Sequence, residues 1–133
     1  MSQENAEVVR RLYDAQARND LDTIRELYDP GIEWDDVSGL WGDWGARRGR
    51  EGVRDAFVSW FEAFEDATFT AEDFLDVDEH VVVTNRIRGR GRGSGLDVDQ
   101  RITLLWTLSG GRVTRVRGYH DRAEALAAVG LSE

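Results

Sequence analysis

The stretch that decides the fold begins at Val81 and reads VVVTNRIRGRGR up to Arg92. Side chains alternate between the two faces of a strand, so the arginines at 86, 88, 90 and 92 share one face. A two-residue turn at Gly93-Ser94 predicts a hairpin with a return strand over residues 96–108. In that hairpin, opposite charges face each other across the two strands: Arg90 opposes Asp97, and Arg88 opposes Asp99.

The same register defines the other face of the hairpin, which is mostly apolar. Its predicted pairs are Val83 with Leu104, Asn85 with Ile102, and Ile87 with Gln100. The glycines within the first strand suit a strand that bends. We therefore expect a curved sheet with one solvated, charged face and one concave, apolar face that other elements must cover.

The elements before the hairpin include the expected cover for the concave face. A helix capped by Ser2 and a second helix capped by Asp20 precede a short strand at 32–35 and a loop at 36–49. A third helix is predicted at about 51–64. Its apolar residues recur at helical spacing, as an aromatic stripe that is typical of a core and less often of a ligand site: Val53, Phe57, Trp60, Phe61 and Phe64.

A strand at 68–77 leads into the hairpin, and a last strand at 112–120 leads to a short helix capped by Asp121. A three-residue loop before the last strand places Arg115 and Arg117 on the outer face, whereas a two-residue loop inverts both faces. We favour the three-residue loop. It predicts these pairs: Trp106 with Thr114, Leu104 with Val116, Ile102 with Gly118, and Gln100 with His120.

The composition indicates one domain over residues 1–133, of the α+β class, because its helices are segregated from an antiparallel sheet. The net charge is −9, and all 17 basic residues are arginines, which disfavours nucleic acid as a partner. No apolar run reaches the ~18 residues of a membrane helix. The N-terminus lacks the apolar core of a signal peptide, so we expect a cytoplasmic protein.

The chain contains no cysteine, which excludes disulfides and cysteine-bound zinc. The two histidines, His80 and His120, have no metal-ligand spacing, so neither a metal nor another cofactor is expected. Residues 89–93 carry alternate glycines, but no helix follows them, so they do not form a phosphate-binding loop.

Several segments together resemble the SnoaL-like branch of the nuclear transport factor 2-like superfamily. They are residues 8–13, 19–22, 30–34, 49–53, 88–95, 106–108, 111–113 and 119–126. The resemblance implies a cone: a curved sheet wrapped around three helices of the N-terminal half, with a short C-terminal helix, an interior apolar pocket and frequent homodimers. It also implies relatives that include ketosteroid isomerases, polyketide cyclases and epoxide hydrolases.

The catalytic residues of those enzymes carry over only in part. Asp35 is similar in placement to the general-base aspartate of the isomerases. The isomerase tyrosine of the first helix falls on Leu12, beside Tyr13, and its strand aspartate falls on Leu104 or Thr103. The strand aspartate of the cyclases falls on Gly118. The resemblance therefore implies the pocket but leaves each known catalytic set incomplete.

The sharpest hypothesis is proton transfer by Asp35 and His120, because a carboxylate in an apolar pocket and a histidine both titrate near neutral pH. Asn85 and Gln100 would then hold a carbonyl oxygen. The alternatives are a solvated strand end for Asp35, a satisfied interior histidine, and two amides bonded to each other. The expected pocket lining is Leu12, Gln16, Trp34, Phe57, Trp60, Phe61, Asn85, Gln100, Ile102, Leu104, Trp106, Val116 and Gly118.

Three functional hypotheses follow from this pattern. The first is acid–base catalysis on a small apolar molecule, of isomerase, cyclase or hydrolase type. The second is binding of such a molecule without catalysis, in a pocket that lacks an aligned acid and base. The third is a dimerising interaction domain whose pocket is filled by Trp41, Trp60 and Phe64.

Overall fold

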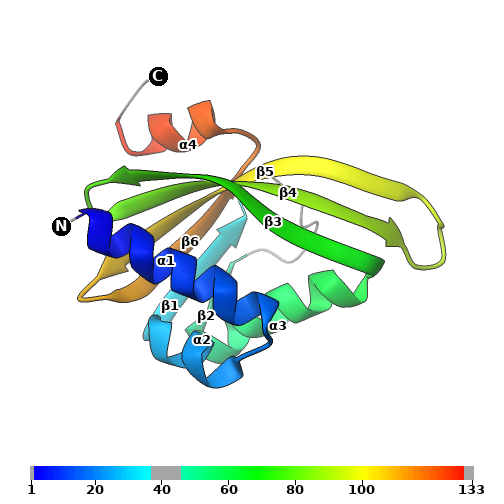
Figure 1. Cartoon of the computed structure of the whole chain (residues 1–133), viewed down its shortest axis with the longest axis horizontal. Coiled ribbons are helices and arrows are strands. Elements are labelled where there is room, and N and C mark those ends of the chain that lie inside the picture. Colours follow the sequence, from blue (N-terminus) through cyan, green and yellow to red (C-terminus); the bar gives the residue numbers. More distant parts are fainter. Residues whose placement is uncertain (1, 37–45, 131–133) are drawn as a thin grey trace.

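A curved, unclosed sheet organises the chain in the computed structural model, which describes residues 2–36 and 46–130 (Figure 1). The strand order is β2-β1-β6-β5-β4-β3. β1 runs parallel to β6 and the other neighbours are antiparallel, so the sheet predicted as antiparallel is mixed. The strands are β1 (Tyr28–Asp36), β2 (Arg47–Arg48), β3 (Phe64–Val77), β4 (His80–Gly91), β5 (Asp97–Ser109) and β6 (Arg112–Tyr119).

Four helices cover the two faces of this sheet within the described ranges: α1 (Ser2–Ala17), α2 (Leu21–Leu27), α3 (Gly49–Glu62) and α4 (Arg122–Ala128). The first three lie on one face and α4 lies on the other (Figure 1). Asp20 and Asp121 cap α2 and α4 as predicted, because each side chain accepts a hydrogen bond from the backbone N–H three residues later. α3 ends earlier than predicted, and Phe64 begins β3 instead.

The predicted register of the β4–β5 hairpin is confirmed at all five pairs, from Arg90 with Asp97 to Val83 with Leu104. The turn itself is wider than predicted. The Gly91 N–H donates to the Leu96 carbonyl at 2.9 Å, which leaves residues 92–95 as a four-residue loop. The register is unchanged because the wider loop is extended by one residue on each side.

The β5–β6 hairpin has the predicted faces but not the predicted pairs. Its turn is the two-residue Gly110-Gly111, in which both glycines have positive φ angles of 60° and 80°. A bulge between Thr107 and Leu108 inserts one extra residue, which restores the faces that such a turn alone would invert. Trp106 therefore pairs with Val116 and Leu104 with Gly118, two positions away from the predicted partners.

Two apolar layers hold the sheet. The main core lies between the concave face and α1, α2 and α3, and its largest fully buried side chains include Trp34, Trp106 and Tyr28. On the opposite face, Ala125 and Leu126 of α4 pack on Val82, Leu105 and Tyr119 of the strands, with Ala125 fully buried. No helix in the described part of the chain has both the length and the apolar character needed to span a membrane.

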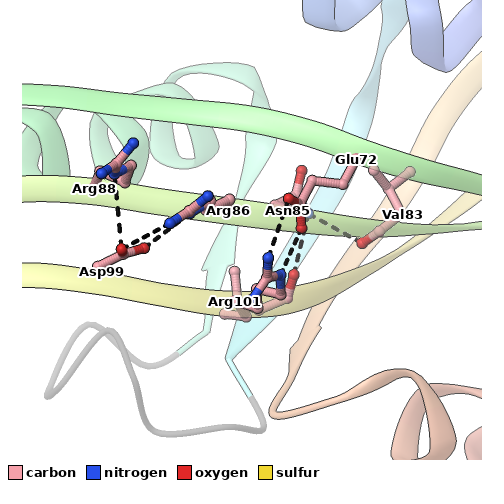
Figure 2. Close-up of polar contacts among 8 residues, drawn as sticks. Glu72, Val83, Asn85, Arg86, Arg88, Asp99 and Arg101 are labelled. Carbon is pink, nitrogen blue, oxygen red and sulfur yellow. Dashed lines mark hydrogen bonds and ion pairs between the residues drawn. The ribbon is translucent and has the colours of Figure 1, made fainter.

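The outer face of β3, β4 and β5 carries Arg86, Arg88 and Arg90 of the predicted charged row, and Figure 2 shows the first two with Asp99. Arg92, predicted on the same face, follows β4 and instead hydrogen-bonds the Glu62 carbonyl of α3. Arg86 donates two hydrogen bonds to the carboxylate of Asp99, at 2.9 and 2.8 Å. Arg101 likewise donates two to the carboxylate of Glu72, at 2.7 and 3.4 Å. Because these pairs are exposed, we expect them to favour the register while contributing little to overall stability.

Candidate functional site

A groove of about 690 Å³ opens between α1, α2, α3 and the edge strand β3. Each helix presents to it a stripe at helical spacing. The stripes are Tyr13, Gln16 and Ala17 of α1; Leu21 and Ile24 of α2; and Arg54, Phe57, Val58, Phe61 and Glu62 of α3. β3 completes the groove with residues 67–70, and Asn19, Tyr28 and Arg92 also contribute.

The groove gathers apolar side chains that water would otherwise surround. Four large apolar side chains are exposed within the described part of the chain, and three of them line this groove: Leu21 (43% exposed), Val58 (41%) and Phe61 (39%). The fourth, Leu96, lies at the tip of the β4–β5 hairpin. Concave apolar surface of this kind is typical of a binding site, since soluble proteins otherwise keep such patches small.

The floor of the groove is fixed by a hydrogen-bonded trio that links α1 to the sheet. The Tyr13 hydroxyl donates to Oδ1 of Asn85 at 2.7 Å and accepts from Nε1 of Trp106 at 3.3 Å. The Asn85 amide nitrogen donates to the Val83 and Ile102 carbonyls at 3.0 and 3.4 Å (Figure 2). Both nitrogen protons are thus engaged, and Oδ1 has to accept, so the Tyr13 proton is committed to Asn85.

Burial is the main reason that the pKa of Tyr13 is raised well above its usual value. Burial likewise raises the pKa of Tyr28, whose hydroxyl is hydrogen-bonded to Gln16. Both phenols are therefore neutral at physiological pH. The ring of Tyr13 packs edge-on against Trp106 and Phe74, each at a centroid distance of 5.7 Å. This contact geometry makes the floor an aromatic surface whose polar atoms are already paired.

Three charged residues are among the described residues that line the groove: Arg54, Glu62 and Arg92. Arg54 near the start of α3 is exposed and has no ion pair or hydrogen bond with the described residues. At the other end of α3, Arg92 donates from Nε to the Glu62 carbonyl at 2.8 Å and lies 3.9 Å from the Glu65 carboxylate. The two ends of the groove thus differ in charge.

The groove includes Gln16, Phe57 and Phe61 of the predicted pocket lining. Most of the other predicted residues are buried beneath the groove in the packed core. These residues are buried and are not among those that line the groove. The buried residues are Leu12, Trp34, Asn85, Ile102, Leu104, Trp106, Val116 and Gly118. The Trp60 side chain and Trp41 lie outside what the structure describes.

Three polar residues predicted to face the interior do not do so. Gln100 is exposed, because the β4–β5 hairpin extends beyond the helices that cover its base (Figure 1). Trp34 faces the core and packs against Phe57, so strand alternation turns Asp35 to the opposite face, beside Arg117 of β6. His120 follows the end of β6, is exposed, and hydrogen-bonds Glu124 of α4 through its backbone N–H and Nδ1.

Sequence reasoning missed the groove residues of α2 and β3 and the role of Tyr13. The spacing of Tyr13, Gln16 and Ala17 on one helical face was available in the sequence, as was that of Leu21 and Ile24. No pattern indicated that Phe69 of β3 would face α3, where its ring lies 6.4 Å from that of Phe57. No cluster of three or more metal-ligating side chains occurs among the described residues.

Fold and groove together define an α+β cone with a small-molecule-sized recess at its mouth. A family model described as a SnoaL-like domain matches residues 9–116. The chain belongs to this SnoaL-like family, as its sequence resemblance implies. A relative from Mycobacterium tuberculosis, an uncharacterized protein, is 34% identical over 117 residues, which span 86% of each chain.

Solved structures show the same fold. A putative SnoaL-like polyketide cyclase from Jannaschia sp. CCS1 is 28% identical, with a TM-score of 0.77 over 98% of this chain and 91% of the other. TerC, crystallised with polyporic acid, is 20% identical, with a TM-score of 0.74 over 96% of this chain and 97% of its own. At that identity the likeness to TerC shows the fold alone.

Proposed function

We propose that this protein binds a small, mainly apolar molecule in the groove between α1, α2, α3 and β3. The observation that carries the proposal is the collection of exposed Leu21, Val58 and Phe61 in one recess of about 690 Å³. That volume lies within the range of ligand pockets, and most of the lining residues are apolar or aromatic. Covering these three side chains with a ligand removes their apolar surface from water.

The polar groups of the groove support binding more than acid–base catalysis. Stabilising an oxyanion requires a donor aimed at the substrate, but the Tyr13 proton is directed to Asn85. Asp35 and His120 do not line the groove, so the pair expected to transfer protons is not brought together there. Glu62 is the carboxylate that does line it, without a histidine among the lining residues.

The structural comparisons agree with a small-molecule ligand. TerC shares this fold and was crystallised with polyporic acid, and the Jannaschia protein is described as a putative polyketide cyclase. The proposed ligand class of this chain, an apolar molecule of comparable scale, follows from its own groove. Its affinity depends on how much of the groove the ligand fills.

The experiment uses a neutral fluorescent probe, N-phenyl-1-naphthylamine, in titrations of the full chain. Ala17 is exposed at the end of α1 and lines the groove, so Ala17→Trp fills the recess without displacing core residues. Ala123 of α4 is also exposed but lies away from the groove, and Ala123→Trp is the matched control.

We expect saturable binding to the wild type and to Ala123→Trp, and at least a tenfold weaker affinity for Ala17→Trp. Bound probe should also raise the midpoint of thermal unfolding, because it binds only the folded state. Equal affinity of all three proteins, or no saturable binding to any of them, contradicts the proposal.

A further inference from the structure

We infer that the groove selects a ligand with a carboxylate at one end, and that Arg54 binds this carboxylate. The inference rests on the proposed function and deepens it by naming the ligand class and its orientation. Arg54, Phe57, Val58, Phe61 and Glu62 lie at helical spacing along the side of α3 that lines the groove. A ligand lying along α3 therefore meets a guanidinium, then an apolar stretch, then a carboxylate.

Arg54 is available to a ligand because the described residues leave its guanidinium unpaired. Two arginines of the sheet are by contrast engaged: Arg86 with Asp99, and Arg101 with Glu72. A guanidinium offers a fork of donors that matches the two oxygens of a carboxylate. One helical turn further along α3, Phe57 and Val58 offer apolar surface to the part of the ligand next to its carboxylate.

The opposite end of the groove does not favour an anion. Arg92 lies there, but it already donates to the Glu62 carbonyl and lies close to Glu65. The side chain of Glu62 also lines the groove at that end and repels a second carboxylate. Glu62 is eight positions after Arg54, which is about 12 Å along a helix. The ligand is thus expected to be elongated, with its acid at Arg54 and its apolar end near Phe61.

The protein carries a net charge of −9, so its overall field disfavours anions. A preference for an acid over an equally shaped neutral molecule therefore has to come from a local cation. For a partly exposed guanidinium we expect a preference of about three- to tenfold at low salt. The preference should shrink as salt is added, because an exposed charge pair is screened.

The test compares biphenyl-4-carboxylate with 4-biphenylmethanol, which share an elongated apolar body of two aromatic rings and differ in charge. Each competes with N-phenyl-1-naphthylamine for the wild type, Arg54→Gln and Arg54→Lys. Arg11→Gln is the control, since Arg11 is an exposed arginine of α1 that does not line the groove. Circular dichroism confirms that each variant is folded.

We expect the wild type and Arg11→Gln to bind the acid three- to tenfold more tightly than the alcohol. Arg54→Gln should remove that preference and leave the affinity for the alcohol unchanged, while Arg54→Lys keeps part of it. If acid and alcohol bind the wild type equally, or if Arg54→Gln keeps the preference, the assignment of Arg54 is wrong although the groove still binds apolar molecules.

A different result would show that the proposed function itself is wrong, and not only the assignment of Arg54. If neither biphenyl compound nor the fluorescent probe binds, the groove is not a small-molecule site, and both proposals fail. Sedimentation of the wild type and Ala17→Trp then shows whether a second copy of the chain covers the groove. A dimer that Ala17→Trp dissociates would identify that occupant and replace the ligand proposal.

Discussion

Tyr13→Phe tests the floor of the groove, because it removes one oxygen on which two buried groups depend. Without the hydroxyl, Oδ1 of Asn85 loses its donor at 2.7 Å and Nε1 of Trp106 loses its acceptor at 3.3 Å. Both residues are fully buried, so no bulk water replaces the missing partner. An unpaired buried polar group costs about 1–3 kcal/mol of stability. The cost for Nε1 of Trp106 should lie at the lower end of this range, because its hydrogen bond is the longer of the two.

The expected loss is therefore about 2–4 kcal/mol of the free energy of unfolding, a large part of the ~5–15 kcal/mol typical of a domain. Urea denaturation followed by circular dichroism measures it, with the slope m unchanged from the wild type. Tyr119→Phe is the matched control, since Tyr119 is buried but has no hydrogen bond from its hydroxyl to the described residues. That control should stay within about 0.5 kcal/mol of the wild type.

A double-mutant cycle separates the hydrogen bond from the loss of the oxygen alone. Asn85→Leu removes the amide that receives the Tyr13 proton. The double variant should therefore lose less unfolding free energy than the sum of the losses of the two single variants. We expect a coupling free energy of about 1 kcal/mol or more. A loss below ~0.5 kcal/mol for Tyr13→Phe would refute the reasoning, since it would mean that water reaches the floor and pairs with both groups.

Three further predictions concern charge, turns and titration. The hydrogen bond from Arg86 holds the pKa of Asp99 below its usual value. The stabilisation from ionised Asp99 is therefore present above the pKa of the unfolded state and is lost as pH falls through the pKa of the folded state. Below about pH 4, the midpoint of thermal unfolding should thus depend less on pH for Asp99→Asn than for the wild type. Gly111→Ala should destabilise by about 1 kcal/mol because φ is 80°, whereas Gly52→Ala within α3 should be neutral or stabilising by urea denaturation. Burial raises the pKa of Tyr28, so in an ultraviolet titration above about pH 10 its phenolate should appear only as the chain unfolds; a difference between wild type and Tyr28→Phe before unfolding would contradict this.

The register of the central hairpin was predictable because local rules determine it. Alternation assigns the faces of residues 81–108, and the turn near residue 93 sets which residues meet. The cap residues of α2 and α4 were predictable for the same reason, since an aspartate bonds a backbone N–H three residues away. The predicted lengths of the β4–β5 and β5–β6 loops were wrong, but the predicted strand faces were still correct. The first loop is longer by one residue on each side, and a bulge compensates for the length of the second.

The parallel pairing of β1 with β6 was not predictable from local patterns, because the two strands are about eighty positions apart in the sequence. The placement of Asp35 was predictable but was missed. Trp34 and Asp35 are neighbours on one strand, so alternation does not allow both to face the same cavity. His120 follows the last residue of β6, where the alternation of the strand no longer applies.

The location of the site required knowledge of side-chain volume. An apolar concave face indicates a covered sheet, but it does not show whether the covered space is filled or open. Here Trp34 and Trp106 are almost fully buried, and Tyr13 packs on Trp106 beneath α1. These large rings are part of the packed core, and the described groove lies next to them, between the helices and β3.

The hydrogen bonds of Tyr13 also affect how the groove binds. Tyr13 cannot rotate away from the floor without leaving Oδ1 of Asn85 and Nε1 of Trp106 unpaired. We therefore expect the floor to keep its shape when a ligand binds. A preformed surface loses little side-chain freedom on binding, which leaves more of the burial energy of Val58 and Phe61 for affinity. Tyr13→Phe should therefore weaken probe binding as well as stability, whereas the control Tyr119→Phe should change neither. Probe titrations of the two folded variants measure this link, and an unchanged affinity for Tyr13→Phe would show that the floor is rigid for another reason.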